Sequence, residues 1–126
     1  MTLKILLAVS YVWMRKVLMS CIQAAGECEI EPVECEADAL ESLDGNDSYD
    51  VVVIYLLPGS SGVKLLEIIK GDKKFGTIPV IFIYENYAKE EVERRKGIFV
   101  DVDFMPDSLT AALAGVATGL KPPTTH

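Results

Sequence analysis

Few side chains of this 126-residue chain could do covalent or metal chemistry, and their spacing argues against both. The only histidine, His126, is the last residue, and no Cys–His or Ser–His–Asp set can be proposed around it. Cys21, Cys28 and Cys35 are seven residues apart, which fits neither a metal knuckle nor a redox C-x-x-C motif. The odd number also argues against a disulfide framework. We therefore expect reduced, mostly buried thiols in a cytoplasmic protein.

One glycine-rich segment has the residue types of a phosphate-binding loop. It is Gly59-Ser60-Ser61-Gly62, followed by Lys64. It lacks the G-x-x-x-x-G-K-[ST] spacing that cradles a phosphate in such loops. A turn that leads into a helix is the better interpretation.

The charge of the chain excludes some partners. Twelve Lys and Arg against nineteen Asp and Glu leave a formal net charge of −7. A surface that acidic repels nucleic acids and anionic membranes, so a basic partner is more compatible with it. An acidic series could dock such a partner, although a run of this kind is more often a solvated face. The series is Glu27, Glu29, Glu31, Glu34, Glu36, Asp38 and Glu41.

No apolar run approaches the ~20 residues that a helix needs to span a bilayer. Residues 1–9 could be mistaken for a short signal sequence, but they have no small-residue cleavage pattern. A buried strand is the better interpretation of this segment.

Five short apolar runs alternate with segments of helical periodicity. Three of them are nearly continuous Val, Ile and Leu, as expected of strands covered on both faces. The second run alternates Glu with Cys28 and Ile30, which is typical of an edge strand with one wet face. The expected strands are Lys4–Val9, Glu27–Ile30, Val51–Leu57, Ile78–Tyr84 and Ile98–Phe104.

The periodic segments predict five helices. The first contains Trp13, Val17, Cys21 and Ala25 at four-residue spacing and ends at Gly26. The others are expected at Ala37–Leu43, from Ser61 to Lys70 with Gly71 as its stop, at Tyr87–Lys96, and after Pro106 with Asp107 or Ser108 as cap. The inward positions of the third helix are Leu65, Leu66 and Ile69, and those of the fifth are Leu109, Leu113, Val116 and Leu120.

Strict alternation of strands and helices predicts an α/β fold with a parallel, doubly wound sheet. We expect one domain over residues 1–120, followed by a linker or tail over residues 121–126. In such a sheet, ligands bind at the carboxyl ends of the strands, near the switch in strand order. The side chains to consider for function are therefore those that end the expected strands.

Five short segments follow one another in the order of a known family. Residues 4–7 (KILL) and 39–43 (ALESL) look like a first strand and a second helix. The most specific segment is residues 49–62 (YDVVVIYLLPGSSG), similar to a third strand and its loop. Residues 78–81 (IPVI) resemble a fourth strand, and Met105-Pro106 falls at a Lys-Pro position. The chain thus resembles the CheY-like receiver domains of bacterial two-component response regulators. The resemblance implies a flavodoxin-like (βα)5 sandwich with a five-stranded parallel sheet of order 2-1-3-4-5.

The resemblance also implies a phosphorylation site, and this chain departs from it at every position. Receivers hold Mg²⁺ with an acidic pair after the first strand, end the fourth strand with Thr or Ser, and place a Lys before the Pro. Here Val9 and Ser10 stand at the acidic pair, Tyr84 at the Thr and Met105 at the Lys.

The phosphoryl acceptor, an Asp at the end of the third strand in receivers, is also replaced. It falls on Ile54 when counted back from Pro58, or on Tyr55 when counted forward from Asp50. No Asp or Glu occurs from residue 51 to residue 61, so a shifted register finds none either. We therefore expect no aspartyl phosphorylation, no bound metal and no cofactor.

Tyrosines occupy the ends of the central strands instead. Tyr11, Tyr55 and Tyr84 all come near the carboxyl edge, and Glu85 is the only carboxylate directly beside them. Their rings could plug the vacated acidic pocket, or they could line a small site for a planar ligand. We favour the plug, because aromatic rings commonly just pack.

The last two helices suggest a contact surface. In receivers, the fourth helix, fifth strand and fifth helix form the usual dimer and output face. Here that face would combine charged and small residues, and an ordinary surface helix fits equally well. The candidate contact residues are Glu91, Arg95, Ala111, Ala114, Gly115 and Thr118.

These features predict a non-enzymatic, phosphorylation-independent signalling module of the cytoplasm. It would bind a signalling protein or an output domain, or itself as a homodimer, but not nucleic acid or membrane. A small-molecule sensor that uses the tyrosine pocket is the alternative. A flavin-binding enzyme of the same topology is disfavoured, because residues 10–14 (SYVWM) offer almost no donors for a phosphate.

Overall fold

The computed structural model describes residues 2–45, 49–55, 61–84, 97–101, 105 and 107–118, with only the backbone described at 61–63 and 118. Nine elements follow one another in this part of the chain. They are β1 (Leu3–Val9), α1 (Val12–Ala25), β2 (Cys28–Val33), α2 (Glu36–Asp44), β3 (Val51–Tyr55), α3 (Ser61–Gly71), β4 (Val80–Tyr84), β5 (Ile98–Asp101) and α5 (Asp107–Thr118). The helix predicted at Tyr87–Lys96 lies outside the described residues, as do the predicted strand ends at 56–57 and 102–104.

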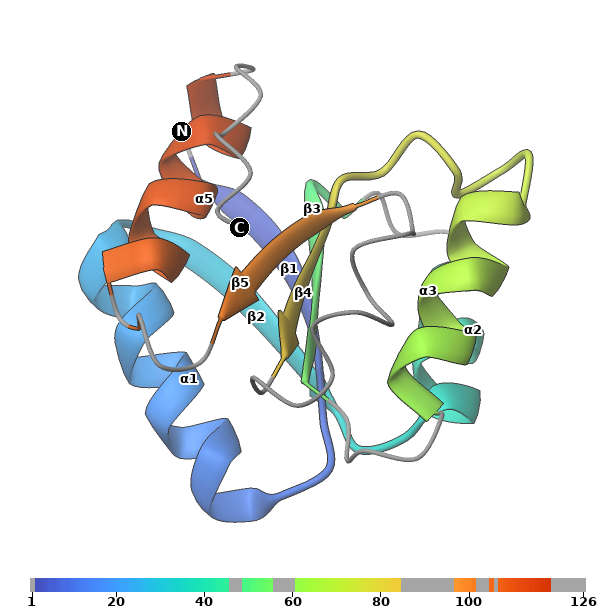
Figure 1. Cartoon of the computed structure of the whole chain (residues 1–126), viewed down its shortest axis with the longest axis horizontal. Coiled ribbons are helices and arrows are strands. Elements are labelled where there is room, and N and C mark those ends of the chain that lie inside the picture. Colours follow the sequence, from blue (N-terminus) through green and yellow to red (C-terminus); the bar gives the residue numbers. More distant parts are fainter. Residues whose placement is uncertain are drawn as a thin grey trace.

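The five strands form one parallel sheet in the order β2-β1-β3-β4-β5 (Figure 1). All four pairings are parallel. The α/β class, the parallel sheet and the strand order 2-1-3-4-5 are therefore confirmed. The order reverses between β1 and β3, which is where sheets of this type bind ligands.

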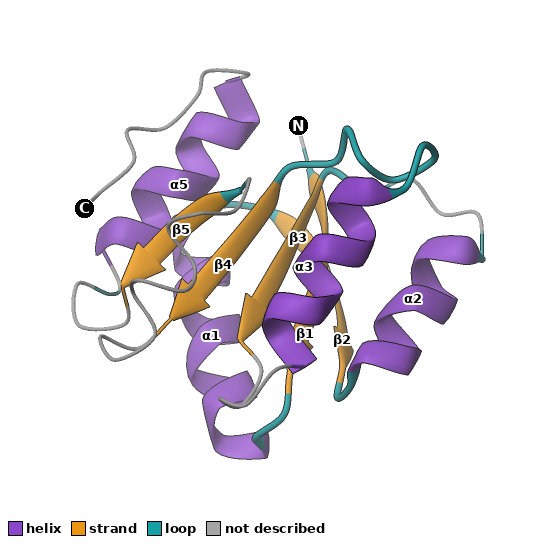
Figure 2. Ribbon diagram, turned by 45° about the vertical axis from the view of Figure 1, so that its right-hand side comes forward, coloured by secondary structure: helices purple, strands orange, loops and turns teal. Residues whose placement is uncertain are grey.

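Helices cover both faces of the sheet. Figure 2 shows α2 and α3 on one face and α1 and α5 on the other. Successive residues of a strand point to opposite faces, so each central strand supplies two cores. In β1, Leu6 and Ala8 join the core under α2 and α3. Ile5, Leu7 and Val9 join the core under α1 and α5. We call these the α2/α3 core and the α1/α5 core.

Strand β2 lies at one rim of the sheet and pairs only with β1 in the described residues. Its exposed Glu29 and half-buried Ile30 fit the predicted edge strand with one wet face. The strand runs further than predicted, to Val33, and passes through Pro32. Proline is tolerated there because an edge residue can direct its nitrogen to solvent.

Strand β4 begins at Val80, two residues later than predicted. The backbone amide of Ile78 donates to the carbonyl of Phe75 at 2.9 Å, so this residue closes a turn instead of pairing in the sheet. The Nζ of Lys70 also donates to the carbonyl of Ile78, at 2.8 Å. The last turn of α3 is thereby tied to the entry of β4.

Helix α1 ends before Gly26 as predicted. This residue has a φ of 153°, a backbone conformation that glycine adopts more readily than residues with a side chain. Its buried residues are Met14, Leu18 and Ile22. The stripe singled out from the sequence instead faces solvent, since Trp13 is 60% exposed and Val17 is 45% exposed. Both stripes have the same helical period, so periodicity located the helix but did not tell which stripe faces the sheet.

The other helices follow their predictions closely. In α3 the inward residues Leu65, Leu66 and Ile69 are fully buried. In α5 Leu109 and Leu113 are buried and Val116 is half-buried against the α1/α5 core. Leu120 lies outside the described residues. None of the helices in the described part of the chain is long and apolar enough to cross a membrane.

The three cysteines are free, as predicted. The expectation that they are mostly buried is wrong, because Cys21 and Cys28 are half-buried and Cys35 is exposed. Cys35 occupies the N-cap position of α2, at the surface turn that follows the edge strand.

Replacing Leu18 by Ala tests the face of α1 that packs on the sheet. We expect a loss of about 2–5 kcal/mol in the free energy of unfolding, because the side chain is fully buried. Trp13→Ala is the matched control on the same helix and should change stability by no more than about 0.5 kcal/mol. Urea unfolding followed by circular dichroism measures both. Equal losses would contradict this assignment of the buried face.

Candidate functional site

The carboxyl edge of the sheet brings together the ends of β1 and β3. Val9 pairs with Tyr55 and Ala8 with Ile54. Ile54 in turn pairs with Phe82 on β4. The positions that carry the metal ligands and the acceptor in a receiver are thus neighbours in this fold, as the motif order predicted.

These positions are occupied by buried apolar groups. Ile54 is fully buried within the α2/α3 core, and Val9 is buried within the α1/α5 core. Ser10, which follows Val9, is only half-buried. Hydrocarbon side chains cannot ligate Mg²⁺, which requires oxygen ligands. In the part of the chain that the structure describes, no group of three or more His, Cys, Asp or Glu could hold a metal ion.

The remaining two positions of the motif are also changed in chemical character. Tyr84 ends β4 as a buried aromatic ring of the α2/α3 core. Met105 is half-buried and packs against the α1/α5 core. A thioether has no charge with which to neutralise a phosphoryl group, and a tyrosine ring fills the space of a smaller hydroxyl residue.

Tyr55 and Tyr84 end β3 and β4, and Tyr11 follows β1 as the N-cap residue of α1, but the sheet separates Tyr84 from the other two. Tyr55 belongs to the α1/α5 core and Tyr84 to the α2/α3 core. Tyr11 packs against the α1/α5 core, and its ring stacks on Trp13 with 5.7 Å between centroids. The structure therefore brings Tyr11 and Tyr55 to one face and leaves Tyr84 on the other. Glu85, the fourth residue of the predicted pocket, lies outside the described residues.

One polar residue of this edge was not singled out from the sequence. Asp101 ends β5, pairs with Tyr84 and is the charged side chain that is buried among the described residues. The segment VDVDF places Asp101 and Asp103 in equivalent positions of an alternating pattern. Nothing in that pattern marks Asp101 as a buried residue.

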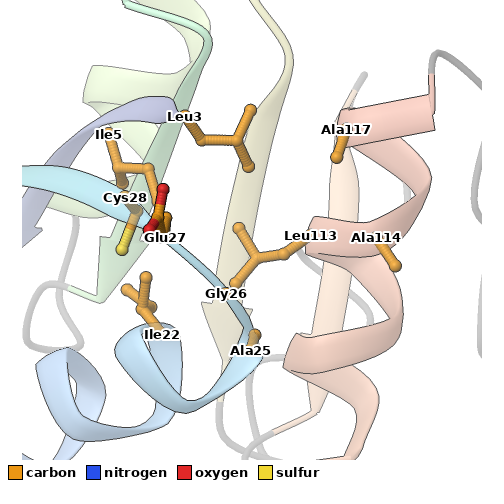
Figure 3. Close-up of a pocket in the computed structure, with 10 residues that line it drawn as sticks. All are labelled: Leu3, Ile5, Ile22, Ala25, Gly26, Glu27, Cys28, Leu113, Ala114 and Ala117. Atoms are coloured by element: carbon orange, nitrogen blue, oxygen red, sulfur yellow. The ribbon is translucent and has the colours of Figure 1, made fainter. Parts of the chain in front are cut away.

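A cavity of about 170 Å³ lies at the opposite, amino edge of the sheet. Figure 3 shows its walls, which come from the start of β1, the end of α1 and the second half of α5. The lining is mostly apolar and includes Ile22, Leu113 and the half-buried Cys28. Burial raises the pKa of the Cys28 thiol, so it stays protonated to a higher pH than a free cysteine.

The predicted contact surface is only partly described. On α5, Ala111 and Ala114 are exposed and Gly115 is half-buried. The side chain of Thr118 and the residues Glu91 and Arg95 lie outside the description. The small-residue half of this surface is therefore accessible.

No protein-family model matches the sequence. The structure is nevertheless similar to response-regulator receiver domains. Against the chemotaxis response regulator CheY4 of Vibrio cholerae the TM-score is 0.72 at 18% identity, over 92% of this chain and 99% of that chain. For the receiver domain of a sensor histidine kinase from Pseudomonas aeruginosa PAO1, with magnesium coordinated in its active site cleft, the TM-score is 0.76 at 18% identity, over 90% and 95%.

A third similar structure is NtrX from Brucella abortus. Its TM-score is 0.74 at 23% identity, over 94% of this chain but only 27% of that chain. At such identities the likeness is one of fold. The chain therefore has the CheY-like receiver fold.

Replacing Ile54 by Asp restores a carboxylate at one candidate acceptor position. We expect a loss of more than about 3 kcal/mol at pH 7, because the charge enters a fully buried strand position. Burial would raise the pKa of the new carboxyl, so the part of the loss that comes from its charge should be absent below about pH 4 and grow as the pH rises. The part that comes from the lost isoleucine side chain is independent of pH. Urea unfolding at several pH values measures this, with the exposed Thr110→Asp as control. A cost independent of pH would contradict the burial argument.

The cysteines differ in exposure, and this predicts different reactivity. Cys28 should be alkylated by iodoacetamide several-fold more slowly than the exposed Cys35 at pH 8, because burial limits access to Cys28 and raises its pKa. Mass spectrometry of peptides after short pulses measures both rates in the same sample. Equal rates would show that Cys28 is open to solvent.

Proposed function

We propose that this receiver-fold chain is a phosphorylation-independent signalling module that acts through protein–protein contacts. The observation that carries the proposal is the fully buried Ile54 at one of the two candidate acceptor positions. Tyr55, the other candidate acceptor, is also buried and has no carboxylate.

Phosphoryl transfer to a receiver needs several groups at once. It needs a carboxylate nucleophile, oxygen ligands for Mg²⁺, and a cation and a hydroxyl that stabilise the transferred group. The corresponding residues here are Val9, Ser10, Tyr84 and Met105. A single lost ligand can be compensated by its neighbours, whereas the joint replacement of all these groups removes the chemistry. The proposed module is therefore not an enzyme and needs no metal or cofactor.

The partner in this proposal is a signalling protein or an output domain. A net charge of −7 favours a basic partner surface through long-range attraction. The exposed Ala111 and Ala114 of α5 would allow a close approach of the partner backbone. We place the module within residues 1–120, with residues 121–126 as linker or tail, and in the cytoplasm, where free thiols such as Cys35 persist.

The small-molecule alternative has less support. Tyr55 and Tyr84 are buried in different cores, so their rings act as packing groups on opposite faces of the sheet. A site for a planar ligand at this edge would have to open one of those cores. It remains a prediction that a metabolite screen by thermal shift can test.

Exposure to phosphoryl donors tests the proposal directly. With Mg²⁺ and either acetyl phosphate or beryllofluoride, we expect no acyl-phosphate by mass spectrometry and no amide shifts at Ile54, Tyr55 or Tyr84 by NMR. A receiver that keeps its acidic pair and acceptor Asp is the positive control under the same conditions. Saturable shifts confined to these residues would overturn the proposal.

A further inference from the structure

The exposed large apolar side chains of the described chain are all on one helix. They are Val12, Trp13 and Val17 of α1, which are 52%, 60% and 45% exposed. Trp13 and Val17 are one helical turn apart and share a face with the half-buried Cys21, one further turn along. We call Trp13, Val17 and Cys21 the α1 stripe. Exposed apolar groups that cluster in this way mark interaction sites more often than singly scattered ones.

The ring of Trp13 is held in place although it is exposed. It stacks on Tyr11 with 5.7 Å between centroids and 29° between planes. A stacked ring has fewer orientations to lose when a partner covers it, so its burial in an interface costs less entropy. Tryptophan is also among the residues that contribute most to binding energy in protein interfaces.

The charge of the chain is distributed unevenly around this stripe. All nineteen Asp and Glu residues follow residue 26, so α1 contains none. The charged residues of α1 are Arg15 and Lys16, and Arg15 pairs with Glu34 at 3.4 Å. A helix turns 100° per residue, so Arg15 and Glu34 lie on the side of α1 away from Trp13 and Val17. The stripe therefore faces away from Glu34, the residue that follows β2.

This distribution favours a second copy of the chain as the occupant. Two copies of net charge −7 repel one another wherever their carboxylates approach within a Debye length, about 8 Å at physiological salt. A contact between two α1 stripes joins segments that carry no carboxylate, and the nearest cation, Lys16, lies about 100° around the helix from Val17, at the margin of the contact. A basic partner, in contrast, would be drawn to the acidic surfaces of β2 and α2, where residues such as Glu29 and Asp38 are exposed.

We propose that two copies of this chain associate through the α1 stripe. The contact is a two-fold, antiparallel helix pair centred on Val17, in which Trp13 of one copy packs on Cys21 of the other. A two-fold contact uses the same patch on both copies and closes after two. In the antiparallel arrangement the two helix dipoles point in opposite directions, and their interaction is favourable. The inference rests on the proposed function and names a second copy as one of its protein partners.

The expected dimer is weak and reversible. Helix α1 has 14 residues and is about 21 Å long, so one helix pair buries less than the roughly 1,000 Å² typical of stable interfaces.

Sedimentation velocity over a concentration series should show a monomer–dimer equilibrium, and added NaCl should strengthen it by screening the repulsion. Trp13→Ser and Val17→Ser should each raise the dissociation constant about tenfold or more. Val12→Ser, equally exposed but off the stripe, should change it less than about twofold.

Disulfide trapping tests the geometry itself. In a background with Cys21 replaced by Ala and Cys28 and Cys35 replaced by Ser, Val17→Cys lies on the two-fold axis and should form a covalent dimer under mild oxidation. Val12→Cys is the matched control and should cross-link at least about fivefold more slowly, because it points about 140° away from Val17 around the helix. Circular dichroism confirms that each variant is folded.

Three outcomes would overturn the inference. They are a wild-type chain that stays monomeric at millimolar concentration, a dimer whose affinity is unchanged by Trp13→Ser and Val17→Ser, and equal cross-linking of Val12→Cys and Val17→Cys. Capture of a different protein through Trp13 by such a monomer would also overturn it while leaving the proposed function intact. Saturable beryllofluoride shifts at Ile54 would instead overturn the proposed function and leave the dimer contact standing.

Discussion

The structure depends on a parallel sheet that is covered by helices on both faces. Every residue of β1, β3 and β4 must then fit one of two cores, and almost every one is apolar. In a receiver with a working site, the last residues of the strands escape this constraint and carry oxygen ligands. Here the apolar filling continues to the strand ends at Val9, Ile54 and Tyr84, which are buried. The apolar packing that stabilises the fold thus extends to the edge at which receivers carry those ligands.

The order of the elements was predictable because each central strand is a nearly continuous run of Val, Ile and Leu, and because helical segments separate the runs. The inner face of α3 was also predictable, since Leu65, Leu66 and Ile69 form its main apolar stripe and are fully buried. Helix α1 carries two apolar stripes one residue apart. Only the entry angle from β1 decides that Leu18, and not Val17, meets the sheet, and that angle is a tertiary property.

The site was predictable as a set of positions but not as an arrangement in space. Motif order assigns Val9, Tyr84 and Met105 to positions of the receiver site, because linear spacing survives where side chains have changed. It could not decide between Ile54 and Tyr55, which differ by one residue and therefore point to opposite faces. The alternation of side chains between the two faces of the sheet also places Tyr55 and Tyr84 in different cores.

Pro32 in β2 limits how copies of this protein can assemble through their sheets. At this edge of the sheet, a further strand would have to hydrogen-bond along the outer rim of β2. That rim lacks an amide donor at Pro32 and exposes the charge of Glu29. Both features oppose open-ended, fibre-like stacking of sheets. The chain can therefore be concentrated near its partners without polymerising along this rim, whereas a two-fold contact between helices closes after two copies.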